Sequence, residues 1–213
     1  MMKRMHIHLL CKIRLLALYS DRAEAMTSLK LVSILVITTL ISACVASNKP
    51  TPEELQRLEH PPTAVQAKID KFFPAALAWY NQTEQQLLPK GRVLTAEEQA
   101  MAQQLGLKHP DKVRILALES FPLPEDKTLR AEAERYGLGS PQEAGRTIGH
   151  AVLLKAKYAS DKALLAHELV HVQQIERMGQ ADFLKRYLLE VETLGYTRAP
   201  LELEAYVKQS LKP

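Results

Sequence analysis

The residues with the clearest capacity for chemistry stand together at 167–171, where the sequence HELVH is an HExxH motif. On a helix, residues four apart share one face, so His167 and His171 could bind one metal ion through nitrogens about 2 Å from it. Glu168 lies about 100° around the helix from His167 and could hold a metal-bound water without being a ligand itself. The motif therefore predicts a metal site with a carboxylate beside it.

The residues around this motif indicate that its helix is buried. From 163 to 175, Glu168 is the only charged residue, and a helix that is apolar on nearly every side belongs in a protein core. Burying two imidazoles and a carboxylate without partners costs several kcal/mol. We expect one zinc ion (Zn²⁺) per chain to satisfy these groups. A hydrogen-bonded core cluster without metal is the alternative.

A tetrahedral catalytic zinc needs a third protein ligand and one open position. The sequence LELEAY follows at 201–206, and by residue type alone either Glu202 or Glu204 could serve. With this segment the chain resembles the gluzincin-type zinc metallopeptidases, in which HExxH is followed on a later helix by a glutamate ligand in an ExxAD or ExxAN setting. The resemblance implies that Glu202 is the third ligand and that Glu204 lies off the metal.

The resemblance covers about residues 147–208, and the segment 167–174 (HELVHVQQ) looks like that of small predicted metallopeptidase domains. One position departs from the pattern. Tyr206 stands where relatives often carry an Asp that orients the first histidine, and such partners tune a metal site. In this chain the task must pass to another group.

The resemblance implies that a zinc-bound water hydrolyses a peptide bond, with Glu168 taking the proton and passing it to the leaving amine. The strand predicted at 147–158 is expected to border the cleft and to align an extended peptide along a free edge. The oxyanion of the transition state needs a second donor besides zinc, for which His150, Tyr196 and Tyr206 are candidates. The expected partner is a peptide or protein substrate in the cell envelope.

Periodicity and capping residues predict a fold of class α+β. It is mostly helical, with a small antiparallel or mixed sheet next to the HExxH helix, the zincin-like arrangement that the resemblance implies. Pro74 predicts a break or kink near Phe73. The predicted helices follow Thr51 and cover 63–88, 95–106, 124–136, 160–178, 181–194 and 200–211; the predicted strands are 112–119 and 147–158, the second with a bulge at Gly149.

The N-terminal region has the layout of a secretory signal, in which Lys30 precedes an apolar run at 31–41 and small residues follow. The sequence ISAC at 41–44 resembles a bacterial lipobox, so we expect a lipid on Cys44 that anchors the protein to a membrane, on its periplasmic face, in the bacterial cell envelope. An ordinary secreted protein and a tilted membrane anchor are the alternatives. The predicted parts are an upstream extension plus signal peptide at 1–43 with the usual start at Met26, a lipidated tether at 44–62, and a metallopeptidase domain at 63–213.

The formal net charge of +4 belongs to this N-terminal region. Residues 1–43 hold six basic and two acidic residues, so the rest of the chain has 22 of each and is neutral. A neutral body gives no electrostatic reason to expect a nucleic-acid partner.

Two other functions compete with peptide hydrolysis. One is a non-enzymatic envelope lipoprotein whose zinc site is structural or degenerate and which acts as a binding or assembly factor. A structural zinc has four protein ligands, whereas this sequence offers three obvious ones, which favours catalysis. The other is a peptidoglycan-directed zinc hydrolase, which we rank lower because such enzymes commonly use other ligand spacings.

Overall fold

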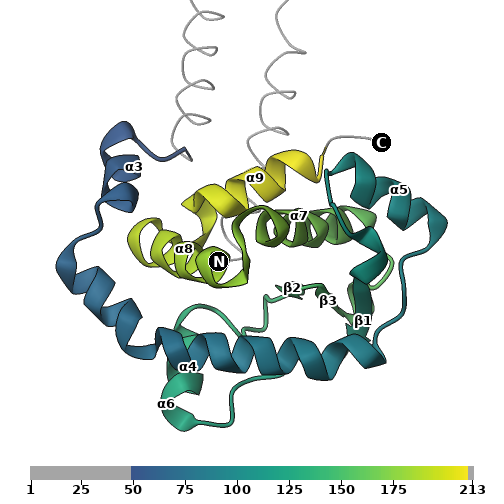
Figure 1. Cartoon of the computed structure of the whole chain (residues 1–213), viewed down its shortest axis with the longest axis horizontal. Helices are drawn as coiled ribbons and strands as arrows, with labels where there is room; N and C mark the ends of the chain where they lie inside the picture. Colours follow the sequence, from purple (N-terminus) through teal and green to yellow (C-terminus); the bar gives the residue numbers. More distant parts are fainter. Residues whose placement is uncertain (1–48, 211–213) are drawn as a thin grey trace, which may run out of the picture. The chain divides into compact units, whose positions relative to one another are not determined.

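A computed structural model describes residues 49–210 of the 213-residue chain. The fold is α+β, as predicted, with helices surrounding one small mixed sheet (Figure 1). The α-helices are α3 (Pro52–Glu59), α4 (Thr63–Leu87), α5 (Ala96–Gln104), α6 (Lys127–Arg135), α7 (Lys162–Met178), α8 (Gln180–Leu194) and α9 (Pro200–Lys208). The strands are β1 (Arg114–Leu118), β2 (Gly145–Ile148) and β3 (Ala151–Lys155), and short 3₁₀ turns are η1 (Leu88–Lys90), η2 (Pro110–Lys112), η3 (Ala156–Tyr158) and η4 (Tyr196–Arg198).

The sheet has the strand order β1-β3-β2, with β1 parallel and β2 antiparallel to the central strand β3. The prediction of a single strand over 147–158 with a bulge was therefore wrong, because β2 and β3 form a hairpin around Gly149 and His150. Gly149 has a φ of 60°, and a Cβ on it would overlap the Glu84 carboxylate. Only glycine suits this turn, which reverses the chain instead of continuing the strand.

Helices cover both faces of the sheet, α7 on one side and α4 on the other (Figure 1). Alternate residues of a strand point to opposite faces, and β3 has apolar residues on both of its faces. Val152 and Leu154 pack with Leu165 and Leu169 of α7, whereas Leu153 packs with Tyr80 of α4. All the residues from Ala151 to Leu154 are fully buried, so β3 fixes the position of α7 relative to the rest of the core.

Helix α4 contains Pro74 and continues through it. A proline inside a helix removes one backbone hydrogen bond and bends the helix axis. Figure 1 shows that α4 changes direction along its length, so the prediction of a kink holds and no break occurs. None of the helices between residues 49 and 210 combines the length and apolar composition needed to cross a membrane.

The short helix α3 packs against the body of the protein. Thr51 begins it with the predicted capping box, in which its hydroxyl accepts from the backbone of Glu54 and the Glu54 carboxylate accepts from the backbone of Thr51. Leu58 of α3 is 2% exposed, and α3 packs against α8. The segment expected to serve as a tether thus contains a helix that is part of the folded unit.

Candidate metal centre

The HExxH motif lies in the middle of α7, between the sheet and α9. Asp161 starts this helix, because its carboxylate accepts hydrogen bonds from the backbone N–H groups of Ala163 and Leu164 at 2.9 and 3.1 Å. The apolar residues that follow bury the helix on nearly all sides, as its sequence predicted. Ile175 of α7, Phe183 of α8 and Leu201 of α9 form a separate buried cluster that holds the three helices together.

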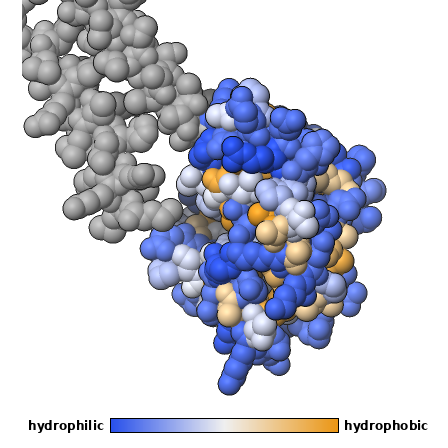
Figure 2. Space-filling view, turned by 90° about the vertical axis from the view of Figure 1, so that its left-hand side faces the viewer, coloured by the Kyte–Doolittle hydropathy of each residue, from blue (hydrophilic) through white to orange (hydrophobic). Residues whose placement is uncertain are grey.

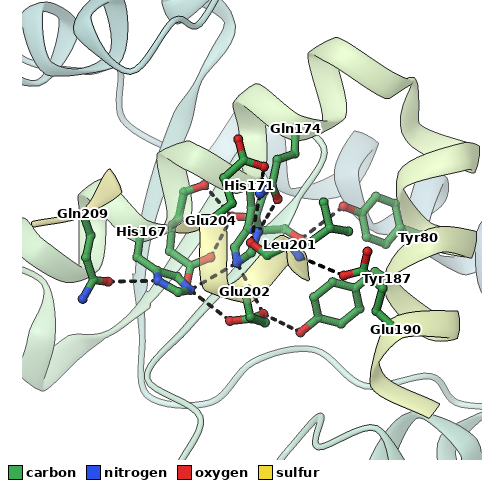
Figure 3. A network of polar contacts seen from close by, with 12 residues as sticks. Tyr80, His167, His171, Gln174, Tyr187, Glu190, Leu201, Glu202, Glu204 and Gln209 are labelled. Atoms are coloured by element: carbon green, nitrogen blue, oxygen red, sulfur yellow. Dashed lines mark hydrogen bonds and ion pairs between the residues drawn. The ribbon is translucent and has the colours of Figure 1, made fainter. Parts of the chain in front are cut away.

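Three potential metal ligands converge at one point. Nε2 of His167 lies 3.2 Å from Nε2 of His171, and the carboxylate oxygens of Glu202 lie 3.3 Å from the first nitrogen and 3.4 Å from the second. Figure 3 shows both imidazoles turned toward Glu202, which reaches them from α9. The three residues are between 1% and 6% exposed.

These distances fit a bound metal ion. Four ligands arranged tetrahedrally at about 2.0–2.1 Å from an ion are about 3.3 Å from one another, close to the separations found here. The carboxylate oxygen Oε2 of Glu202 is buried and has no hydrogen-bond partner among the described residues. A buried carboxylate oxygen without a partner is costly, and a cation between the three side chains would satisfy it. The group His167, His171 and Glu202 could therefore hold a metal ion.

The electrostatics of the group favour positive charge at its centre. Burial lowers the pKa of His171, but the hydrogen bond and the charge of Glu202 outweigh burial and raise the pKa to about 9. Burial raises the pKa of Glu202, but contacts with His167 and His171 outweigh burial and hold the pKa well below its usual range. Glu202 is therefore an ionised carboxylate whose charge can be balanced by a protonated histidine or by a bound cation.

A ring of further polar side chains orients the ligands, and sequence reasoning missed it. The Oε1 atom of Gln209 lies 2.9 Å from Nδ1 of His167, and Oε1 of Gln174 lies 2.8 Å from Nδ1 of His171. The hydroxyl of Tyr187 on α8 donates to Oε1 of Glu202 at 2.8 Å (Figure 3). Of these three residues, only Gln174 could have been linked to the site from the sequence, because it follows His171 by three residues on the same helix.

Glu204 does not join the two histidines. Its carboxylate receives two hydrogen bonds from the guanidinium of Arg177, at 3.0 and 2.9 Å, and lies 2.7 Å from the ammonium of Lys208. It also accepts from the side-chain amide of Gln174 at 3.0 Å. Of the two glutamates that the sequence offered, the structure brings Glu202 to the histidines and uses Glu204 to hold α9 against α7.

Glu168 lies beside the three ligands, and its side chain points toward strand β2. The hydroxyl of Thr147 donates to Oε2 of Glu168 at 2.7 Å, and Gly145 is so close that a Cβ there would overlap the carboxylate. Burial raises the pKa of Glu168, while the charges of His171 and His167 act in the opposite direction. The site therefore contains a buried carboxylate of increased basicity that is not one of the three ligands.

The three candidate oxyanion donors are in different places. The ring centroid of Tyr206 lies 4.7 Å from that of His167. Partial burial raises the pKa of Tyr196 and of Tyr206. These residues border the site and are 40% and 44% exposed, respectively. The ring of His150 instead contacts Glu84 and Glu176.

The proposed lipidation site Cys44 lies outside the described residues. A scan against protein-family models, a search of curated proteins and a search of solved structures found no match to this chain.

Proposed function

We propose that this protein is a zinc-dependent peptidase that is anchored in the bacterial cell envelope by a lipid on Cys44. The observation that carries the proposal is the position of Glu168, a buried carboxylate with a raised pKa next to a set of three potential ligands. Three protein ligands leave one position of a tetrahedral zinc open, which is the arrangement of catalytic sites.

In this proposal, metal binding and proton transfer are carried out by different residues. His167, His171 and Glu202 would hold the zinc, which when bound polarises the attacking water and the scissile carbonyl. Glu168 takes the proton from the water and delivers it to the leaving amine, and its raised pKa suits a group that must act first as base and then as acid.

The hydroxyls of Tyr196 and Tyr206 are the donors for the oxyanion. A tyrosine with its ordinary pKa of about 10 is already protonated at neutral pH, and burial raises the pKa of both residues further.

Strand β2 is the element that would align a substrate. The central strand β3 is paired on both sides, so the free edge nearest Glu168 belongs to β2, which carries Gly145 and Thr147. An extended peptide adds to such an edge through main-chain hydrogen bonds. The substrate we propose is therefore a peptide or an unfolded protein segment of the envelope.

Metal analysis and a cleavage assay on the full chain test this function. The protein should bind about one zinc per chain by its ligand count and cleave members of a peptide library. Glu168→Gln should keep the zinc and reduce hydrolysis roughly 10²–10⁴-fold, the usual contribution of a general base. Absence of metal from protein prepared without chelator would refute the zinc site, and hydrolysis that survives Glu168→Gln would refute the assigned base.

One observation favours a second function, that of a non-enzymatic binding or assembly factor. Glu168 is 5% exposed and the ligands are 1–6% exposed, which restricts access to the centre. A site of this kind could stabilise the helices without turning over a substrate. The two functions differ in the same assay, because the second requires zinc binding without cleavage of any peptide.

A further inference from the structure

Helix α3 is bound to the turn that precedes α9. The guanidinium of Arg198, in η4, forms two hydrogen bonds with the carboxylate of Glu54, and one of them measures 2.8 Å. Arg198 also donates to the carbonyl oxygen of Lys49 at 3.4 Å. Since α9 starts at Pro200, this contact connects α3 to the start of the helix that carries Glu202.

A second set of contacts connects α3 to the start of α9 through α8. Arg186 on α8 lies 3.0 Å from the carboxylate of Glu59 on α3 and 2.7 Å from that of Glu190 on its own helix. Glu190 is 1% exposed, and its other oxygen accepts from the backbone N–H of Leu201 at 2.8 Å. Leu201 directly precedes Glu202 in the sequence.

Glu190 takes the place of a capping residue for α9. Ala199 precedes this helix and provides no side-chain hydrogen bond, and Pro200 has no N–H group. The N–H of Leu201 is thus the first that needs an acceptor, and Glu190 supplies it from another helix. The start of α9, and with it Glu202, is positioned by groups on α8 that are themselves paired with α3.

We propose that α3 is a clasp that positions Glu202, through the contacts Glu54–Arg198 and Glu59–Arg186–Glu190, so that the docking of α3 sets the metal affinity of the site. The inference rests on the proposed zinc binding by His167, His171 and Glu202. Because α3 begins eight residues after Cys44, a partner that binds or pulls on this segment would act on the centre through these contacts.

The chemistry of the contacts suits a clasp that can open. Hydrophilic residues cover most of the side of the molecule that carries α3 and α8, and apolar residues there form small separate patches (Figure 2). Ion pairs in contact with water are weak and are screened by salt, so they can release without unfolding the core. A metal site is sensitive to such a change, because its ligands must be held within about 0.5 Å of their positions.

The test compares zinc affinity in variants of the full chain, measured by competition with a chelator. Glu54→Gln combined with Glu59→Gln should weaken zinc binding about tenfold, the lower end of what loss of a supporting partner costs. Asp70→Asn is the matched control, because it removes a partner of Lys185 on the same helix α8 without a connection to α9. A double variant that binds zinc as tightly as Asp70→Asn would overturn the proposal.

Two further measurements separate positioning from general loss of stability. The absorption spectrum of the cobalt-loaded protein reports coordination geometry and should change in the double variant but not in Asp70→Asn. Arg198→Glu should weaken metal binding, and adding Glu54→Arg should restore it by reversing the pair. Failure of this exchange to restore affinity would overturn the clasp, whereas absence of zinc from the wild-type protein would overturn the proposed function as well.

Discussion

The side-chain oxygen of Gln209 lies 2.9 Å from Nδ1 of His167, although 42 residues separate them in the sequence. An amide oxygen can only accept a hydrogen bond, so Nδ1 of His167 is the donor in this contact, and Nε2 of the same ring faces Glu202. The motif's resemblance to the gluzincin type leads us to expect a partner for the first histidine at the position of Tyr206, whereas in this chain that partner is Gln209. In this chain Tyr206 instead lays its ring against His167.

His171 is oriented in the same way by Gln174, whose amide group in turn donates to the carbonyl oxygen of Leu201 at 2.9 Å. Both histidines thus have a neutral amide partner, where a carboxylate would make the imidazole more basic. The two amides fix the orientation of the imidazoles without adding negative charge around a metal ion that would bind there.

Removal of the Gln209 contact should weaken metal binding. Gln209→Leu has a similar volume but no acceptor, and it should lower zinc affinity roughly 10–100-fold, as measured by chelator competition. Gln209→Glu restores an acceptor and should regain most of the affinity. Gln66→Leu, on an exposed part of α4, controls for the loss of a surface amide. Equal affinities for Gln209→Leu and wild type would show that His167 needs no such partner.

The two glutamates of α9 should differ sharply in their effect on zinc. Glu202→Ala removes a ligand and should reduce affinity by more than the roughly 10–100-fold attached to an outer partner. Glu204→Ala breaks partly exposed pairs with Arg177 and Lys208 and should cost about 1 kcal/mol of unfolding free energy. Metal titration and urea unfolding measure the two effects, and the reverse order in the titration would contradict the ligand assignment.

Gly145→Ala should damage catalysis and spare the metal. The added Cβ would overlap the carboxylate of Glu168 and displace it, and a shift of about 1 Å at a reacting group costs on the order of 10²-fold in rate. Zinc content should stay at the wild-type value, because the three ligands lie elsewhere. Gly137→Ala is the control, since its Cβ meets no atom within 4 Å and its φ of 95° costs only local strain. Full activity in Gly145→Ala would mean that Glu168 is not the base.

The closeness of the two histidines could be predicted from the sequence because it depends on local geometry. Spacing of four residues places His167 and His171 on one face of any helix, and the absence of other charges predicts burial. The choice of Glu202 over Glu204 came from the resemblance, since both lie within one helical turn. Their difference arises from the rotation of α9 against α7, which no local pattern encodes.

The supporting residues could not be predicted because their positions also depend on how the helices pack, which no local pattern encodes. Tyr187, Glu190 and Gln209 reach the site from α8 and from the end of α9, and each fits the polar pattern of an exposed position. The hairpin at Gly149 did have a signal, because Gly-X between two short apolar runs is typical of a two-residue turn. Apolar residues continue on both sides of it, which made one long strand look equally consistent.

The contacts of Glu192 predict how stability depends on pH in a region away from the metal. Partial burial raises the pKa of this carboxyl, but hydrogen bonds from Lys68 and Arg135 outweigh it and lower the pKa to about 2. The contribution to stability is therefore complete above the ordinary pKa of 4.5, falls as the pH drops below it, and is lost below about 2. Glu192→Gln should cost about 1 kcal/mol at pH 7, after allowance for solvent screening. The same substitution should cost less at pH 3, as measured by urea unfolding.

Glu97→Gln is the control for this prediction. The pair of Glu97 with Lys162 is 71% exposed on both sides, so its loss should change the free energy of unfolding little at either pH. An equal cost of Glu192→Gln at both pH values would contradict the lowered pKa of Glu192.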